Sequence, residues 1–267
     1  MAKGVNVSYM TLRRFQGQSI LITGGAGGIG RQIARQFAEQ GGKVGILDSN
    51  LNAIESIVAE IVASGAVAAG EHVDVRDSIA VERAINKLAD TLGGVNVLVT
   101  AAGGSLGTPR DLDEISSDDL DLVLDVNIKG TFNCAKSVIP FMKKSGGGSI
   151  ITFSSIGGRS ASPVTGVPYA AAKAAILGLT RRLAKEVGEF NIRVNAIAPG
   201  LFLTYRLEGM FDQMSAAERS EVLSAIPLGR MPTLKECADP VLFLASEESS
   251  FITGIVLDVN GGRLMPN

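Results

Sequence analysis

The chain has 267 residues, of which 46% are hydrophobic and 19% charged, a composition typical of a globular protein with a sizeable core. Its formal net charge is −2 and its basic residues form no stripe, so nucleic acid and anionic membranes are not expected partners. The sequence contains no apolar run of about 20 residues and no apolar segment of the signal-peptide type at its start. We therefore expect neither a membrane span nor a secretory signal.

Cysteine and histidine are too sparse to indicate a metal site. Cys134 and Cys237 lie far apart in the sequence and lack metal-ligand spacing, so we expect two reduced, part-buried thiols and a cytoplasmic location. The single histidine, His72, excludes a histidine-rich metal site. We expect His72 to be a strand residue rather than a catalytic base.

A glycine-rich run, G-G-A-G-G-I-G, separates a short apolar strand at 19–23 from a helical stripe that begins near Ile33. In that position the free N–H groups and the positive end of the helix dipole can bind a pyrophosphate. A glycine-rich string alone also fits a flexible turn, but the strand before it and the helix after it favour nucleotide binding. The residues expected at this site are Gly24, Gly28, Ile29 and Gly30.

The next predicted strand, 43–47, ends at Asp48, roughly 20 residues after Gly24, which is the separation expected of a ribose-binding carboxylate. Such a carboxylate accepts hydrogen bonds from the adenosine hydroxyls and repels the 2′-phosphate of NADP. Because no Arg or Lys follows Asp48 directly, we expect the cofactor to be NAD. Asp48 also suits a helix N-cap, an interpretation compatible with ribose binding.

Helix and strand patterns alternate along the rest of the chain without a repeat or a linker. This alternation predicts an α/β fold in one domain: a Rossmann-type, doubly wound parallel sheet with helices on both faces. We expect a leader at 1–17, the domain at 18–262, and a substrate lid at 201–232. The predicted helices are 51–63, 77–92, 118–142 with a kink near Pro140, 168–188 and 235–245, and the predicted strands are 66–73, 95–100, 149–153, 191–197 and 254–258.

Residues able to bind a ligand follow several of these strands. Sheets of this kind bind ligands at the carboxyl ends of their strands. The glycine loop, Asp48, Asp74, the segment 101–103, Ser155 and Gly200 all fall at such ends. We therefore expect these residues to meet in one crevice.

Tyr169 and Lys173 are four residues apart in a predicted helix, so their side chains lie on one face. A phenol titrates near ~10 and needs a fixed ammonium nearby to accept a proton at neutral pH. The Y-x-x-x-K pattern by itself also fits an ordinary amphipathic helix with a rim tyrosine and a lysine. Asn127, inside another predicted helix, is either a buried amide with a specific polar task or an exposed surface amide.

Together these residues resemble the short-chain dehydrogenase/reductase family, in its single-domain form of about 250 residues, from about Phe15 to Gly262. Extended members that epimerise sugars are longer, and enoyl reductases space the tyrosine and lysine more widely. The motifs that carry the resemblance are T-G-G-A-G-G-I-G at 23–30, Asp48, Asp74–Val75, A-A-G at 101–103, Asn127, S-x-x-G from Ser155, Y-A-A-A-K at 169–173 and P-G-L-F-L-T at 199–204.

The resemblance implies an NAD-dependent oxidoreductase that interconverts a secondary alcohol and a ketone. Tyr169 would be the general acid/base, and Lys173 would lower the pKa of its phenol and bond the nicotinamide ribose. Ser155 would donate to the substrate oxygen, and Asn127 would hold a water that links Lys173 to solvent. The implied cofactor contacts are Gly24, Gly28, Ile29, Gly30, Asp48, Asp74, Val75, Ala101, Gly103, Tyr169, Lys173, Gly200, Phe202 and Thr204.

The sequence departs from the family pattern in two places. The asparagine that ties the central strand to its neighbour is replaced where Thr100 and Ala101 stand, which puts local strand pairing in doubt. Ser154 and Ser155 are adjacent, and we choose Ser155 because it keeps the S-x-x-G register. The separation from Ser155 to Tyr169 is also slightly longer than in close relatives, which indicates an insertion in the loop.

Two other functions stay open. A 3-oxoacyl thioester reductase, acting on an acyl-carrier-protein or CoA substrate, has the same catalytic set, but those enzymes commonly use NADPH and Asp48 counts against it. A non-catalytic NAD-binding sensor or scaffold belongs to another class, and the complete catalytic set counts against it.

The lid at 201–232 is rich in apolar side chains, which favour an apolar or aromatic alcohol or ketone as substrate but also fit simple lid packing. The helices at 118–142 and 168–188 and the last strand resemble the family's tetramer contacts, so we expect a homotetramer. The apolar lid residues are Leu201, Phe202, Leu203, Tyr205, Leu207, Met210, Phe211 and Met214.

Overall fold

The computed structural model describes residues 13–161, 165–202 and 215–266. Its strands are β1 (Ser19–Thr23), β2 (Lys43–Asp48), β3 (Ala68–His72), β4 (Val97–Thr100), β5 (Gly148–Phe153), β6 (Ile192–Pro199) and β7 (Val256–Val259). Its α-helices are α1 (Gly28–Glu39), α2 (Leu51–Ala63), α3 (Ser78–Leu92), α4 (Ser117–Leu124), α5 (Gly130–Lys144), α6 (Val167–Val187), α8 (Ala216–Ser224) and α9 (Leu234–Ala245).

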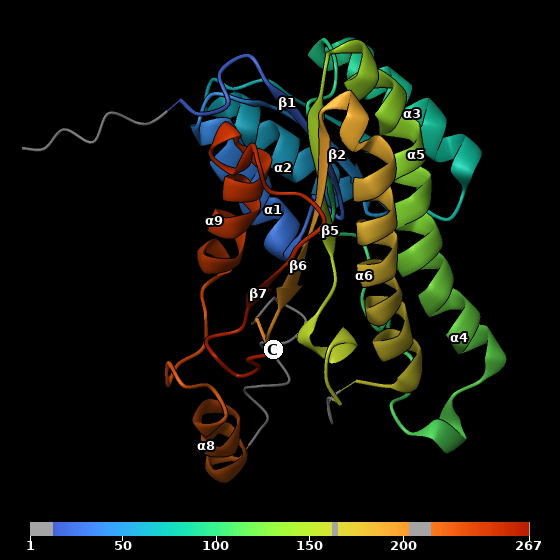
Figure 1. Cartoon of the computed structure of the whole chain (residues 1–267), viewed down its shortest axis with the longest axis vertical. Helices are drawn as coiled ribbons and strands as arrows, with labels where there is room; N and C mark the ends of the chain where they lie inside the picture. Colours follow the sequence, from blue (N-terminus) through green and yellow to red (C-terminus); the bar gives the residue numbers. More distant parts are fainter. Residues whose placement is uncertain (1–12, 162–164, 203–214, 267) are drawn as a thin grey trace, which may run out of the picture.

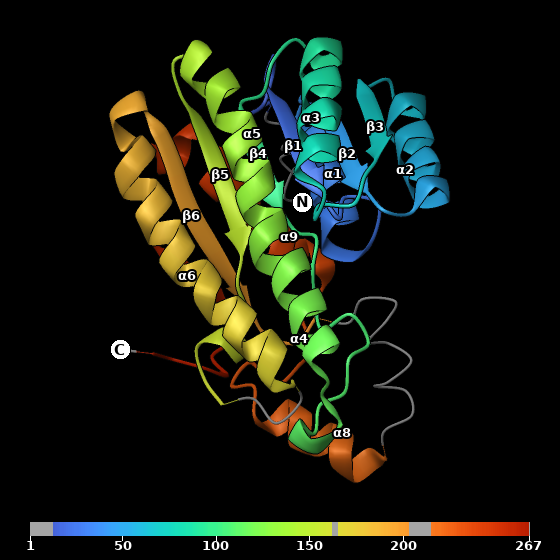
Figure 2. The same cartoon turned by 90° about the vertical axis from the view of Figure 1, so that its right-hand side faces the viewer.

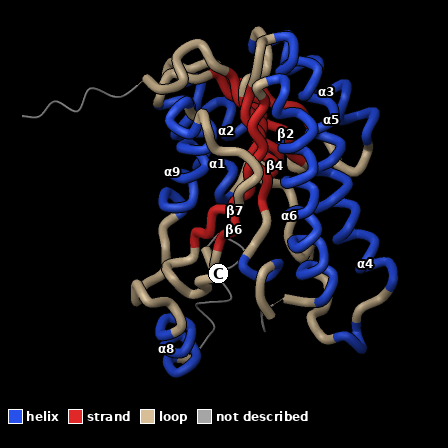
Figure 3. The backbone as a smooth tube through the Cα atoms, in the orientation of Figure 1, coloured by secondary structure: helices blue, strands red, loops and turns tan. Residues whose placement is uncertain are grey.

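The strands form one parallel sheet in the order β3-β2-β1-β4-β5-β6-β7. Helices α1, α2 and α9 cover one face, and α3, α5 and α6 cover the other (Figures 1 and 2). The tube in Figure 3 shows the strands as a single central layer between these helices. The predicted α/β, doubly wound fold class is confirmed.

Each face of the sheet has its own hydrophobic core, because side chains alternate along a strand. In β1, Ile20 and Ile22 point into the core beneath α1, α2 and α9, whereas Leu21 points into the core beneath α3, α5 and α6. All of β1 is buried, as a central strand covered on both faces requires.

The strand order reverses between β1 and β4, since β1 leads outward through β2 to β3 and the chain then returns to β4. A crevice outside the carboxyl ends of the strands at such a reversal is the usual ligand site of this fold. A Cβ atom built on Gly24, just after β1, would lie 2.8 Å from the backbone nitrogen of Ala102, just after β4. The two strand ends therefore abut only because residue 24 is glycine.

The long helix predicted at 118–142 is not a regular α-helix throughout. The chain forms α4, then a π-helical segment at Asp125–Lys129, then α5. We expected a kink near Pro140, but the helix is not interrupted there, because α5 continues past Pro140 to Lys144. The irregular turn instead contains Asn127, and π segments of this kind occur frequently at functional sites.

The predicted leader at 1–17 also needs correction at its end. The Phe15 side chain is fully buried and stacks on Phe37 of α1, with ring centroids 4.2 Å apart. Its backbone N–H donates to the carbonyl of Gln40. Residues 13–17 thus belong to the packed domain, and residues 1–12 lie outside the described part.

Strand pairing is intact at the position where the family asparagine is missing. Thr100 is in register with Thr23 of β1 and Thr152 of β5, so the doubt about this pairing is removed. The Thr100 hydroxyl is buried and has no hydrogen-bond partner among the described residues. An orphaned hydroxyl of this kind costs about 1–3 kcal/mol, so Thr100 does not replace the missing tie.

The structure shows the surroundings of the single histidine and the two cysteines. His72 lies in the edge strand β3, where it is exposed and its Nε2 is 3.1 Å from the Ser49 carbonyl. Cys134 and Cys237 are unpaired, and both are fully rather than partly buried. Burial raises the pKa of each thiol to about 12. No helix in the described ranges has both the length and the apolar character needed to cross a membrane.

Candidate active site

The glycine loop between β1 and α1 leaves room for a phosphate group. A Cβ on Gly30 would lie 2.2 Å from the Gly24 carbonyl oxygen, so Gly30 lets the loop fold tightly onto itself. A Cβ on Gly27, the N-cap of α1, would meet no atom within 4 Å, and no side chain caps this helix end. The first N–H groups of α1 are therefore left without a side-chain partner, and uncapped N–H groups of this kind are able to bind a pyrophosphate. Of the predicted residues, Gly24 lies in this loop, and Gly28, Ile29 and Gly30 form the first turn of α1.

Asp48 ends β2 beside the same loop. Its Oδ2 accepts a hydrogen bond from Ala26 N at 3.1 Å, and its Oδ1 accepts from Asn50 N at 3.1 Å. Asn50, not Asp48, caps α2, because the Asn50 side chain accepts from Ala53 N. The helix-cap interpretation of Asp48 is wrong, and its half-buried carboxylate stands next to the glycine loop.

The predicted pair Asp74 and Val75 lies just after β3. Arg76 donates to both Asp74 oxygens, with an Nη2–Oδ2 distance of 2.6 Å, and this hydrogen bonding lowers the pKa of Asp74. Both partners are about 45% exposed, so the ion pair contributes little free energy and can open to admit a ligand. Val75 is buried.

Asn127 is almost completely buried, so the exposed-amide interpretation is wrong. Its Oδ1 accepts from Gly104 N at 3.0 Å, and its Nδ2 donates to the carbonyls of Gly104 and Val123. Both amide hydrogens are used, which leaves only acceptor positions for a water. A Cβ on Gly103 would lie 2.3 Å from Asn127 Oδ1 and 3.6 Å from Lys173 Nζ, so only glycine fits between them.

The two adjacent serines after β5 have different tasks. The Ser154 side chain is buried, and its hydroxyl donates to the Lys173 carbonyl at 2.7 Å. Ser155 is partly exposed, and its Oγ accepts from Gly157 N at 3.1 Å. Ser155 Oγ and Tyr169 Cε1 each lie 3.6 Å from the same point, the Cβ position of Gly157. The geometry therefore places Ser155, and not Ser154, beside the tyrosine.

Tyr169 and Lys173 lie one turn apart near the start of α6. Lys173 Nζ is 5.6 Å from the centre of the Tyr169 ring and donates to the Phe153 carbonyl at 2.9 Å. The lysine is only 5% exposed, and burial lowers the pKa of its ammonium from the usual 10.5 to about 8. The group is still mostly protonated at neutral pH, so a positive charge stands beside the phenol in a weakly hydrated site.

The segment after β6 packs against the end of β7. Gly200 N donates to the Val259 carbonyl, and a Cβ on Gly200 would lie 2.9 Å from the Cβ of Asn260. Phe202 is buried in the core beneath α9, which fixes the backbone that the prediction assigned to the cofactor. Thr204 lies outside the described residues. Ala101 and Gly103 follow β4, as expected.

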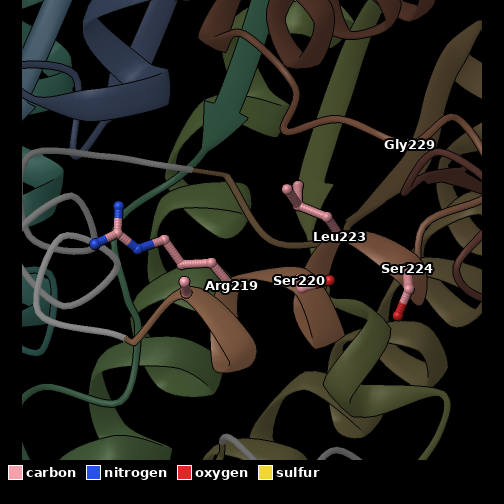
Figure 4. A pocket seen from close by; sticks show the side chains of 6 residues that line it. Arg219, Ser220, Leu223, Ser224 and Gly229 are labelled. Carbon is pink, nitrogen blue, oxygen red and sulfur yellow. The ribbon is translucent and has the colours of Figure 1, made fainter.

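The described part of the predicted lid includes α8, which lies beyond the carboxyl ends of the strands (Figure 1). A cavity of about 610 Å³ is lined by Ala216, Arg219, Ser220, Leu223, Ser224 and Gly229. In Figure 4 the Arg219 side chain extends from α8 on the opposite side from Ser224. No residue of the predicted catalytic set lines this cavity. Of the apolar lid residues, only Leu201 and Phe202 are described.

One functional candidate was missed at the sequence level. Asn133 of α5 is buried, and it donates to the backbone of the loop that contains Asp74 and Val75. The only sequence signal was a polar residue on the apolar face of a predicted helix, and its partner is 58 residues away.

The buried ammonium predicts a specific pH dependence of stability. In the unfolded chain Lys173 keeps its proton up to about pH 10.5, whereas the folded protein loses it near pH 8. The destabilisation is therefore complete below pH 8 and is relieved as the pH rises toward 10.5. Relative to the Lys173→Met variant, wild type should gain up to about 3 kcal/mol of unfolding free energy between pH 7 and 10, measured by urea unfolding. Parallel stability curves for the two proteins would contradict this.

Known proteins match this chain along nearly its whole length. The family model described as "Enoyl-(Acyl carrier protein) reductase" matches residues 24–263. The chain is 36% identical over 250 residues to a 2-dehydro-3-deoxy-L-rhamnonate dehydrogenase (NAD(+)) of a Sphingomonas strain, with 94% of this chain and 96% of that protein covered. It is 38% identical over 254 residues to a 3-oxoacyl-[acyl-carrier-protein] reductase of Thermotoga maritima, with 94% and 100% covered.

Among solved structures, a 3-oxoacyl-[acyl-carrier protein] reductase with bound NAD from Brucella melitensis matches with a TM-score of 0.87 and 35% identity. The match covers 100% of this chain and 98% of that one. The family model names one activity, and these relatives have others, but all share the fold and cover nearly the whole chain. The chain belongs to the short-chain dehydrogenase/reductase family.

Proposed function

We propose that this protein is an NAD-dependent oxidoreductase that interconverts a secondary alcohol and a ketone, with Tyr169 as general acid/base. The observation that carries the proposal is that Ser155, with Tyr169 and Lys173 beside it, lies at the carboxyl ends of the strands, as does the glycine loop. The Sphingomonas relative, an NAD(+) dehydrogenase, supports the same reaction class.

The bound nicotinamide would supply or accept the hydride. Tyr169 would accept the hydroxyl proton in oxidation and return it to the carbonyl oxygen in reduction. The buried Lys173 ammonium favours the phenolate form by its charge. Since Ser155 Oγ accepts from Gly157 N, its own hydrogen remains to be donated to the substrate oxygen.

Asn127 would act by holding the segment at 103–104 against Lys173 and by offering an acceptor to a water on the path to solvent. Its main-chain carbonyl already accepts from Thr131 Oγ1 at 2.8 Å, in the π turn. A carbonyl oxygen has two lone pairs, so it can accept from a water as well.

A second candidate is a 3-oxoacyl thioester reductase. The Thermotoga relative and the Brucella structure favour it, and the latter holds NAD, so an NAD-type site does not exclude that activity. We propose an apolar or aromatic alcohol as the substrate from the lid composition, although the described face of α8 also carries Arg219, Ser220 and Ser224. A screen for NADH formation across secondary alcohols, run beside 3-oxoacyl thioesters with NADH, separates the two.

We also propose a homotetramer in the cytoplasm. Exposed apolar side chains on α5, on α6 and just before β7 support self-association: Phe132, Val167 and Phe251. The free buried cysteines fit a reducing compartment. Sedimentation equilibrium should give the mass of four chains, and a monomer mass would contradict the assembly.

The Tyr169→Phe variant tests the catalytic proposal. It keeps the ring and removes the titrating hydroxyl, so turnover should fall by about 100-fold or more while NADH still binds. The measurement is kcat with an active alcohol, with NADH affinity by fluorescence titration as the control for folding. Unchanged turnover would remove Tyr169 from the mechanism and would favour another acid/base.

Two variants of Asp48 test the cofactor preference. Asp48→Ala should weaken NAD binding by about tenfold or more and raise the kcat/KM ratio of NADP to NAD, because the ribose acceptor and its charge are lost. Asp48→Asn retains an acceptor for Ala26 N, so it separates loss of charge from loosening of the glycine loop. Wild-type preference for NADP would overturn the argument.

A further inference from the structure

The amide of Asn133 crosses from α5 to the loop after β3. Its side chain lies under the surface, with 7% of the residue exposed. Nδ2 donates to the Val75 carbonyl at 2.9 Å and, at a longer 3.4 Å, to the Arg76 carbonyl. Among the described residues, the Asn133 side chain bonds the carbonyls of Val75 and Arg76 and no residue of the predicted catalytic set, and the mechanism above does not use it.

The contact between α5 and this loop is close. A Cβ on Gly130 would lie 2.5 Å from Val75 Cγ2, so the valine packs directly on the helix backbone. Asn133 lies about one turn further along α5 and bonds the carbonyl of the same valine. One apolar contact and one hydrogen bond therefore hold Val75 from a single helix face.

The same peptide unit connects Asn133 to Asp74. The Val75 carbonyl and the Arg76 N–H belong to one planar peptide group. Asn133 bonds the carbonyl end, and the N–H end donates to Asp74 Oδ1 at 2.9 Å. Fixing the carbonyl therefore fixes the direction of the N–H and, through it, the Asp74 carboxylate.

The Asp74 side chain depends on this support because the other contacts around it are weak. β3 is the edge strand of the sheet, and its residues are only partly buried. The other bond to the Asp74 side chain is the exposed pair with Arg76, which contributes little. Without the Asn133 bond, a ligand would have to order the loop on binding, which lowers its affinity.

We propose that Asn133 is a positioning residue for the adenine end of the cofactor site, acting through the peptide between Val75 and Arg76 on Asp74. This rests on the proposed dinucleotide function. It assigns to Asn133 a share of the affinity for the adenosine half of NAD and none for the nicotinamide half. It also assigns it no part in proton or hydride transfer.

The test compares Asn133→Leu with wild type in binding NAD, AMP and nicotinamide mononucleotide by calorimetry. The dissociation constants of NAD and AMP should rise about five- to tenfold, the size of one ordinary hydrogen bond, while that of nicotinamide mononucleotide stays unchanged. At saturating NAD, kcat should stay within about twofold. Unchanged AMP binding, or an equal rise for both half-cofactors, would overturn the proposal.

Asn195→Leu is the matched control for lost stability. Asn195 is fully buried, and its Nδ2, like that of Asn133, donates to a backbone carbonyl, that of Ile252, at 2.9 Å. It lies in β6, separated by four strands from β3 and the loop that contains Asp74 and Val75. This variant should lose thermal stability yet bind AMP like wild type. An AMP affinity that falls equally in both variants would show a merely structural effect and would overturn the proposal.

Asn133→Asp keeps the shape and provides a second readout if the leucine variant does not fold. The ionised carboxylate would face the Val75 and Arg76 carbonyls, whereas the protonated form regains a donor. AMP binding should be weakest at alkaline pH and approach wild type as the pH falls. A pH profile identical to wild type would contradict the proposal, whereas a wild type that binds neither NAD nor AMP would instead defeat the proposed function.

Discussion

The buried ammonium of Lys173 is the constraint on which the rest of the site depends. A charge removed from water is costly unless it is hydrogen-bonded, and Nζ bonds the Phe153 carbonyl at the end of β5. The next residue, Ser154, returns a bond to the Lys173 carbonyl, so strand and helix are joined in both directions. This double tie fixes the start of α6, and with it the position of Tyr169. The contacts that dock α6 onto the sheet are thus the same contacts that position Tyr169.

Space around this charge is controlled by glycine and by the π turn. Gly103 stands between Lys173 Nζ and Asn127 Oδ1, where any side chain would collide. The wider π turn contains Asn127, whose amide bonds both polar groups of Gly104. An ordinary helical turn at Asp125–Lys129 would place this amide in a different direction, since each residue advances about 100° around an α-helix. The irregular backbone therefore serves the polar site.

Apolar periodicity and motifs in the sequence predicted most of the fold. The features that they did not predict depend on contacts between residues far apart in the sequence. Leu51–Ala63 and Ser19–Thr23 have the predicted limits because apolar periodicity and turn residues lie within each segment. The π turn was missed because its stabilising partner, Gly104, lies 23 residues away. Asn133 was missed for the same reason. The motifs predicted Ser155, Tyr169 and Lys173 at the carboxyl ends of the strands and favoured Ser155 over Ser154, whereas the bond from Ser154 to the Lys173 carbonyl is seen only in the structure.

The two ends of the crevice are built from interactions of different strength. The end that contains Lys173, Asn127 and Ser154 uses buried polar groups, whose loss is expensive because a partner is left unsatisfied. The end that contains Asp48 and Asp74 lies nearer the surface, and the ion pair between Asp74 and Arg76 there contributes little free energy. Substitutions at Asp74 should therefore cost little stability, whereas substitutions at Lys173, Asn127 or Ser154 should cost more.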